Sequence, residues 1–233
     1  TEAAEQLDNI FTDMLKAAER RHSGLYYFRA DSAYCCQEVI KVCMKKGLHF
    51  TITAHDGTTG WKDRLEHEGI DWKPWIYTQE DLSRAKEREE ELPTVEVGRF
   101  FWAPSWSKQT LLFPIVVKRT WKPLRDEKHQ GDIFAPDTFK ELGEWDYYAV
   151  VTHYKLAQWS LQSVLEHHAK RGNSENFVKE EKYNFKLKNF PCQKLLANHA
   201  WILLAQVAHN MIRWIAMMDR PDKPHYSKKL RNK

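Results

Sequence analysis

The chain has 233 residues, of which 42% are hydrophobic and 29% are charged, a composition that excludes a disordered chain and fits one large domain or a domain with an insertion. Residues 1–5 are acidic and lack an apolar stretch, so they do not form a signal peptide, and the missing initiator Met suggests a processed or truncated chain. The net charge of +4 is unevenly distributed, because residues 155–233 hold 15 Lys and Arg against 6 Asp and Glu. This basic third is suited to a polyanion, although a solvated basic surface without a partner fits equally well.

The cysteine pattern bears on the compartment. The four cysteines form no C-x-x-C pair and have no histidine partner at zinc-ligand spacing; they are Cys35, Cys36, Cys43 and Cys192. This pattern predicts buried thiols in a reducing compartment, and we expect the protein to be cytoplasmic.

The first quarter of the chain has the pattern of an α/β fold. Apolar residues at three- and four-residue spacings predict an amphipathic helix over residues 2–21. A second helix, residues 36–46, lies between two short β-rich runs, residues 25–31 and 49–54. This order predicts a parallel pair of strands in an α/β sheet, with Asp31 at the end of a central strand.

The composition changes over residues 55–148, which hold seven of the ten tryptophans. The expected elements are one charged helix followed by two strands, over residues 80–91, 95–102 and 111–121. We interpret this stretch as a β-rich insertion between a partial core, residues 1–54, and a helical part, residues 149–233.

The last third is predicted to be helical after a final strand-like run over residues 147–152. Helical segments are expected over residues 158–170 and 174–186, and Gly172 leaves open whether they form one helix or two. A long helix over residues 195–218 contains polar residues that favour burial in a protein core over a membrane span.

Two groups of residues are candidates for chemistry. Asp31 lies where open α/β sheets place ligand-binding residues, although an acid before a helix is also a common N-cap. His168, Arg171, Glu175 and Lys182 are spaced by three, four and seven residues, which predicts one stripe along a helix. An exposed helix carrying the i,i+4 ion pair of Arg171 and Glu175 is the alternative interpretation.

These residues resemble a known pattern. The stripe reads H-x2-R-x3-E-x6-K, and it is similar to the Y-x2-R-x3-E-x6-K signature around the catalytic Glu of DDE-type transposases of bacterial insertion sequences. Residues 28–34, around Asp31, resemble the strand-end segment that carries the second catalytic Asp of that family. Residues 185–210 resemble its closing helices, so the similarity spans residues 25–219.

The resemblance implies a ribonuclease-H-like α/β core, incomplete at its N-terminus, with a β-rich insertion and C-terminal helices. It implies that Asp31 and Glu175 are catalytic and bind Mg²⁺, with Mn²⁺ as a substitute; carboxylates suit such hard cations. It also implies DNA-backbone contacts by His168, Arg171 and Lys182, since cations stabilise a phosphoryl group that gains charge.

By the same resemblance we expect metal-dependent DNA cleavage and strand transfer at transposon ends. The expected partners are double-stranded transposon-end DNA and a second copy of the chain on paired ends, in the bacterial cytoplasm and without a membrane. Related transposases stack a flipped base on an aromatic residue of the insertion. Candidates are Trp102, Trp106 and Trp121, although core packing is the favoured role for each.

Two departures from the family pattern affect the expectation. His168 stands where the signature has Tyr, and its charge depends on pH near neutrality. The first catalytic Asp of the family lies upstream of Thr1, so we expect this polypeptide to be inactive by itself and the full-length protein to be the enzyme.

Other functions remain compatible with the sequence. A ribonuclease-H-like nuclease without strand transfer would differ only in the joining step. A non-catalytic DNA-binding remnant would bind phosphates through Arg171 and Lys182 without a metal, and a protein-interaction scaffold would have no salt-dependent affinity for DNA.

Overall fold

The computed structural model describes residues 2–19, 25–108, 110–123, 143–172, 178–179, 182–183, 187 and 189–219. The chain divides into two compact units, Thr1–Ala169 and Lys170–Lys233.

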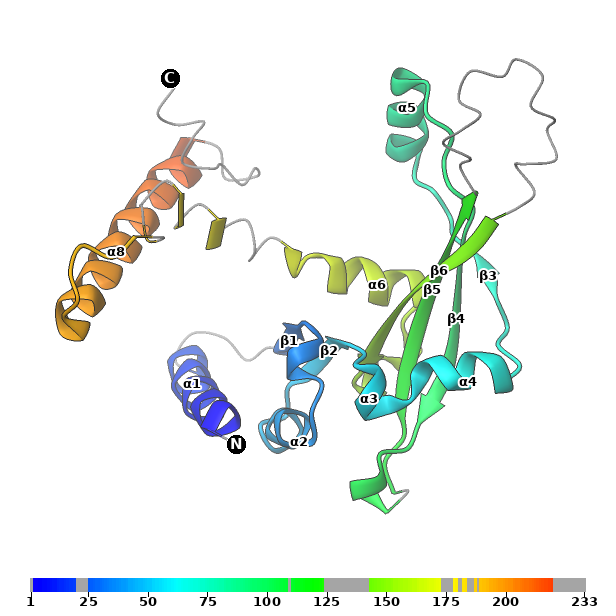
Figure 1. The fold of residues 1–233 in the computed structure, drawn as a ribbon, viewed down its shortest axis with the longest axis horizontal. Helices are drawn as coiled ribbons and strands as arrows, with labels where there is room; N and C mark the ends of the chain where they lie inside the picture. Colours follow the sequence, from blue (N-terminus) through cyan, green and yellow to red (C-terminus); the bar gives the residue numbers. More distant parts are fainter. Residues whose placement is uncertain are drawn as a thin grey trace. The chain divides into compact units, whose positions relative to one another are not determined.

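The first unit contains one sheet with helices on both of its faces (Figure 1). Its strands are β1 (Tyr27–Ala30), β2 (His49–Thr53), β3 (Lys73–Pro74), β4 (Val95–Trp102), β5 (Phe113–Pro123) and β6 (Gly143–Thr152). Its helices are α1 (Glu2–Glu19), α2 (Gln37–Lys45), α3 (Asp56–Thr59), α4 (Trp61–His67), α5 (Gln79–Arg88) and α6 (Leu161–Ala169), with short 3-10 turns η1 (Ser32–Tyr34), η2 (Ser105–Ser107) and η5 (Tyr154–Gln158).

The strand order is β1-β2-β6-β5-β4-β3. β1 and β2 pair in parallel and α2 lies between them in sequence, which confirms the predicted strand, helix, strand unit. The other four pairings are antiparallel. In the described sheet β1 is at an edge, so the prediction that Asp31 follows a central strand is wrong for these strands.

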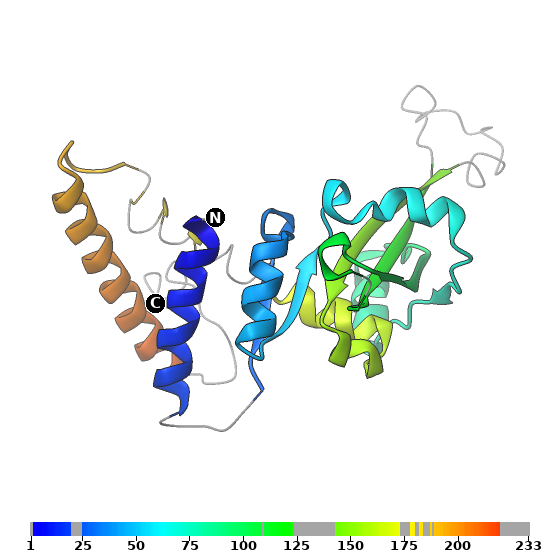
Figure 2. The same cartoon turned by 90° about the horizontal axis from the view of Figure 1, so that it is seen from below.

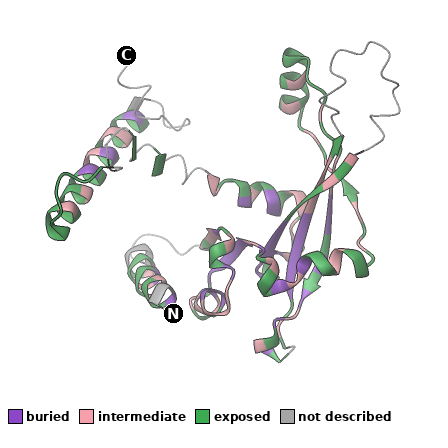
Figure 3. Ribbon diagram, viewed as in Figure 1, coloured by how far each residue is buried: buried purple, intermediate pink, exposed green. Residues whose placement is uncertain are grey.

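The sheet is covered on both faces because its inner strands are apolar on both sides. One face packs against α2 and Trp61 of α4, with Phe50, Ile52 and Phe113 in the core. The other face packs against α6, whose Val164 and Leu165 cover three valines, Val97, Val116 and Val150. Figure 3 shows this buried layer along the central strands. The first four residues of β2 are buried, with Phe50 and Ile52 on the α2 side and the polar His49 and Thr51 on the α6 side.

The first helix belongs to the α2 side of the sheet. Figures 1 and 2 show α1 next to α2, and the ring of Phe11 on α1 lies edge-on to Phe28 of β1 with centroids 5.2 Å apart. Lys46, after α2, donates to Thr12 Oγ1 over 2.7 Å. The predicted amphipathic helix over residues 2–21 is thus confirmed for the described residues 2–19.

The β-rich stretch 55–148 joins the same sheet as β1 and β2, because β6 pairs with β2. The stretch also contains α3 and α4, which the sequence did not indicate. Gly60, at φ 59°, separates these two helices in a left-handed conformation that favours glycine. The compact units divide after Ala169, and the boundaries expected at residues 54 and 148 stay a prediction.

Gly98 marks a close approach of two segments on the α2 side of β4. A Cβ at this position would overlap Cγ2 of Ile70 and lie 3.1 Å from Cε3 of Trp72. The segment before β3 therefore crosses directly over β4, and glycine leaves the space for it.

Cysteine burial follows the prediction only in part. Cys35 and Cys43 are buried, Cys36 is half-buried and Cys192 is exposed. Burial raises the pKa of the Cys43 thiol to about 12, so this thiol stays protonated. The prediction of a buried thiol is wrong for Cys192.

In the second unit the long helix is α8, Leu195–Asp219, which confirms the predicted helix. Ala205, His209 and Ala216 are buried. The expected core burial is not observed for large apolar side chains that include Leu195, Leu196, Trp214 and Met218, which are exposed. Among the described residues, none of the helices has the length and apolar character needed to cross a membrane.

Candidate active site

The parallel strands β1 and β2 end side by side, and this end of the sheet holds Asp31. The register pairs Ala30 with Ile52, so its continuation by one residue sets Asp31 opposite Thr53. Side chains alternate between the faces of a strand, which assigns Asp31 and Thr53 to the face covered by α6. Carboxyl ends of parallel strands are the usual ligand-binding edge of an α/β sheet.

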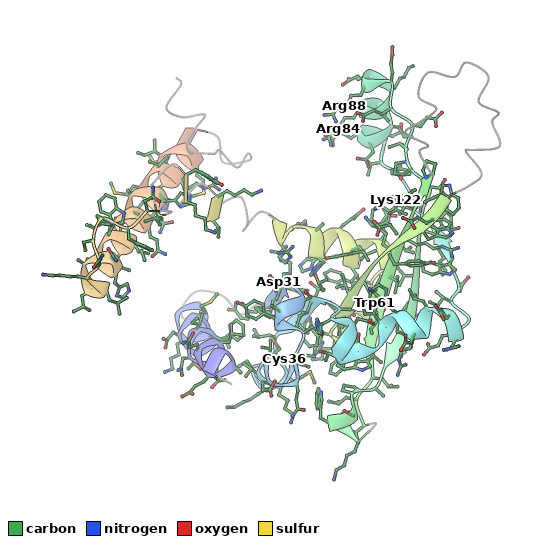
Figure 4. All side chains as sticks on the ribbon, viewed as in Figure 1. Asp31, Cys36, Trp61, Arg84, Arg88 and Lys122 are labelled. Carbon is green, nitrogen blue, oxygen red and sulfur yellow. The ribbon has the colours of Figure 1, made fainter. Side chains whose placement is uncertain are left out.

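Asp31 is exposed and has extended backbone angles, φ −79° and ψ −177° (labelled in Figure 4). Its Oδ1 accepts a hydrogen bond from Ala33 N over 3.0 Å and so caps the turn η1. The cap interpretation is therefore confirmed. A carboxylate has about four lone-pair positions, so a cap that occupies one of them is compatible with a metal ligand.

His168 lies beneath the same strand ends and is only 1% exposed. Its Nδ1 lies 3.1 Å from Thr51 Oγ1 and 3.2 Å from Thr51 O, and its Nε2 lies 3.1 Å from Thr53 Oγ1. The imidazole of His168 thus links α6 to β2 through hydrogen bonds. The DNA contact suggested by its place in the signature stays a prediction, and burial of the ring favours a positioning role.

A second hydrogen-bond link joins the last turn of α6 to β1. The guanidinium of Arg29 donates from Nη1 to the backbone oxygen of His167 over 3.1 Å. Carbonyl oxygens in the last turn of a helix have no partner within the helix, so a cation is a favourable donor there. Arg29 and His168 together fix the carboxyl end of α6 at the strand ends that carry Asp31.

The polar network continues to the surface through Tyr148 of β6. Its hydroxyl lies 3.0 Å from Thr53 Oγ1, and the ring is 38% exposed. Thr53 therefore lies between the buried ring of His168 and the exposed phenol of Tyr148.

The remaining predicted site residues follow α6 in the chain. Arg171 is half-buried and Lys182 is exposed, and both belong to the second unit. Glu175 lies outside the described residues. The structure thus brings Asp31 and His168 to one end of the sheet, and the positions of the other three relative to them stay a prediction.

The donor chemistry of the site can be compared with the expected metal. Within the described ranges, no three His, Cys, Asp or Glu side chains are close enough to hold a metal ion together. Asp31 is an exposed carboxylate at a strand end, and carboxylate oxygen is the donor that Mg²⁺ prefers. Asp31 therefore provides one ligand of the type that suits Mg²⁺.

A second titratable cluster lies at the opposite end of β2. His49 and His153 are 6% and 4% exposed, and their rings stack with centroids 4.8 Å apart. Burial lowers the pKa of both histidines, for His153 to about 4, and the positive charge of Lys155 lowers both further. His153 Nδ1 accepts from Lys155 N over 3.3 Å.

The three candidate tryptophans differ in burial. Trp102 is 5% exposed and belongs to the core, as the core-packing interpretation predicts. Trp106 packs against the same core and has the ammonium of Lys41 5.2 Å from its ring centroid. Trp121 lies edge-on to Trp145 with centroids 5.1 Å apart. Base stacking by any of them stays a prediction.

Three residues of the site were missed in the sequence: Arg29, Thr53 and Tyr148. The signal for Thr53 was present, because Thr51 and Thr53 alternate with Phe50 and Ile52 at two-residue spacing along the strand. Two polar side chains on one face of a buried strand require hydrogen-bond partners, which here come from α6.

No curated protein matches the sequence. The family model described as transposase DDE domain group 1 matches residues 1–231, which is nearly the whole chain. The chain belongs to the DDE transposase domain family, group 1.

Proposed function

We propose that the complete encoded protein cuts phosphodiester bonds at transposon ends and joins the cut ends to new DNA, in a reaction that depends on divalent metal. One observation supports this beyond family membership: the exposed carboxylate of Asp31 follows a strand end to which α6 is tied by Arg29 and His168. The other signature residues, Arg171, Glu175 and Lys182, follow this end of α6 in the chain.

The second predicted metal ligand, Glu175, is six residues beyond Ala169. An extended chain spans at most ~3.3–3.6 Å per residue, so Glu175 is tethered within ~20 Å of the end of α6. A helical path would shorten this to about 9 Å. The tether makes a metal site shared by Asp31 and Glu175 feasible.

In the proposed reaction Asp31 and Glu175 hold Mg²⁺ through carboxylate oxygens. Such cations, when bound, would supply activation of a water or a 3′-hydroxyl for attack on phosphorus and stabilisation of the oxygen that leaves. Arg171 grips a phosphate with paired donors, whereas Lys182 acts as a point charge. His168 and Arg29 keep the helix that precedes these groups in place.

The proposed partners follow from the family. The DNA is the double-stranded end of a transposon, two copies of the protein act on paired ends, and the reaction takes place in the bacterial cytoplasm. The basic balance of residues 155–233 supports a polyanionic partner.

The test measures nicking of a supercoiled plasmid in Mg²⁺ or Mn²⁺ by the complete encoded protein. Asp31→Asn should abolish cutting without unfolding the chain, because Asn caps a helix as well as Asp does. Glu175→Gln should have the same effect. Matched controls are Asp13→Asn on α1 and Glu87→Gln on α5, both of which remove an exposed acid.

Binding of Mn²⁺ separates the alternatives. Loss of Mn²⁺ binding in Asp31→Asn supports the proposal. DNA binding that is insensitive to metal, with no cutting by the wild type, supports a DNA-binding remnant. Cutting without joining of a pre-cut end supports a nuclease that lacks strand transfer.

A further inference from the structure

Tyr148 ends a chain of hydrogen-bonding groups that runs from the sheet interior to the surface. The chain begins at Thr51, passes through the imidazole of His168 and the hydroxyl of Thr53, and reaches the Tyr148 hydroxyl, with successive separations of 3.1, 3.1 and 3.0 Å. Thr51 is 1% exposed and His168 is 1% exposed, whereas Tyr148 is 38% exposed. The polar network thus opens to solvent at one phenol.

The direction of these hydrogen bonds decides what the phenol can offer. When Nε2 of His168 carries the proton, it donates to Thr53, and Thr53 donates to the oxygen of Tyr148. The Tyr148 O–H then points its proton at a partner outside the protein. In the other tautomer Nδ1 donates to Thr51 O, Thr53 donates to Nε2, and Tyr148 donates to Thr53. An acceptor outside the protein therefore selects the first arrangement.

The position of Tyr148 indicates what kind of acceptor its hydroxyl meets. Tyr148 is on the α6 face of β6, next to Thr53, and the register sets Thr53 opposite Asp31 at the end of β1. A DNA phosphate that approaches a cation on Asp31 would reach the same end of the sheet. Phosphate oxygens accept strong hydrogen bonds from hydroxyl donors.

We infer that the Tyr148 hydroxyl donates to a phosphate oxygen of the bound DNA, with Thr53 and His168 as positioning residues. This inference rests on the proposed function. It gives Tyr148 the hydroxyl contact that a tyrosine at position 168 would supply in the signature, since His168 is buried. Sequence spacing could not indicate this role of Tyr148, because Tyr148 lies on β6 and not among the signature residues.

The test compares DNA affinity of the complete protein and its variants for a labelled duplex of arbitrary sequence, with Ca²⁺ replacing Mg²⁺ to prevent cutting. Tyr148→Phe keeps the ring and removes the hydroxyl, so affinity should fall ~10-fold, as for a lost hydrogen bond to a charged group. The slope of log affinity against log salt should not change, because no cation is removed. Arg171→Gln should instead reduce that slope by ~0.9.

Tyr147→Phe is the matched control. Tyr147 is 37% exposed, adjacent in sequence, and on the opposite face, where its ring lies 6.3 Å from that of Trp72. Its variant should bind DNA as the wild type does. Equal losses in the two tyrosine variants would overturn the inference, because they would indicate nonspecific surface effects.

Thr53 variants test the positioning step. Thr53→Val removes the hydroxyl at constant shape and should lower the affinity as Tyr148→Phe does, whereas Thr53→Ser should restore it. The double variant Thr53→Val with Tyr148→Phe should lose no more than Tyr148→Phe alone, because both act through one contact. Additive losses would contradict a shared contact.

Failure of the inference differs from failure of the proposed function. A wild-type protein that binds and cuts DNA, with Tyr148→Phe indistinguishable from it, would overturn the role of Tyr148 alone. A wild type with no salt-dependent DNA affinity would overturn both.

Discussion

The imidazole rings of His49 and His153 stack at 14° with their centroids 4.8 Å apart, in a part of the fold where both are buried. Burial lowers the pKa of both rings and the positive charge of Lys155 lowers both further, while a charge on His49 also lowers the pKa of His153. The folded protein therefore disfavours protonation of both histidines, and the stacked rings are neutral.

The first prediction is that acid destabilises the fold through His153. Burial lowers its pKa from 6.5 to about 4, so between these values the unfolded chain binds a proton that the folded chain does not. The free energy of unfolding should fall as pH drops from 6.5 to 4, by roughly 3 kcal/mol in total, and should be unaffected by His153 above pH 7. Urea unfolding across this range measures the slope.

His153→Asn keeps an acceptor for Lys155 N and removes the titration, so the slope should flatten. His67→Gln on α4 replaces an exposed histidine and should retain the wild-type slope. An unchanged slope in His153→Asn would assign the acid sensitivity to other groups.

The second prediction concerns the tie between α6 and β2. His168→Phe keeps a ring of similar shape but leaves the hydroxyls of Thr51 and Thr53 without its nitrogens, so unfolding free energy should fall by about 2 kcal/mol. Chemical denaturation checks this, with His67→Phe as the exposed control. A loss below about 0.5 kcal/mol, the range of surface substitutions, would argue against a positioning role.

The third prediction tests the close crossing over β4. Gly98→Ala should destabilise the fold by about 1–3 kcal/mol, because the new methyl group overlaps Ile70 and crowds Trp72. Gly69→Ala is the control, since a Cβ there meets no described atom within 4 Å. Ile70→Ala combined with Gly98→Ala should recover part of the loss in thermal unfolding, and a fully additive loss would contradict the overlap.

The fourth prediction concerns Arg119, whose guanidinium lies between two indoles. Its Cζ is 4.1 Å from the Trp72 ring centroid and 4.3 Å from that of Trp145, and its Nε donates to Glu96 over 2.6 Å. Arg119→Lys keeps the charge but loses the planar stacking, so stability should fall by about 1–2 kcal/mol.

Arg84→Lys provides the comparison for this variant. Arg84 pairs with Glu80 on the exposed surface of α5, where such a pair contributes little. Equal stability of the wild type and Arg119→Lys in urea unfolding would mean that charge alone matters at this position.

The sequence predicted elements whose residues repeat a regular pattern. β4 has the expected bounds, because its β-rich run is flanked by breaks and both its faces are partly buried. α3 and α4 were not predicted, since four and seven residues that bury only Thr59 and Trp61 give no periodicity. Pairing of β6 with β2 was also missed, because strand partners distant in sequence are not encoded in local pattern.

The candidate site, like the fold, was predicted only in part from the sequence. The position of Asp31 after a strand was predicted, because an acid after an aromatic run indicates a strand end. The burial of His168 was not foreseen, because its spacing relative to Arg171 predicts a common stripe but does not indicate which side of the helix meets the sheet. A signal existed, however: Val164, Leu165 and His168 continue one stripe at helical spacing, and all three are buried.

The position of β2 between β1 and β6 also constrains how the molecule forms during translation. One neighbour, β1, is synthesised just before β2, but the other emerges only after the entire tryptophan-rich stretch has been made. Until β6 has been made, one edge of β2 lacks its partner strand. Such non-local strand pairing is slow and exposes the nascent chain to aggregation. The ribosome must therefore deliver roughly two thirds of this polypeptide before the strand bearing Thr51 and Thr53 can be completed on both sides.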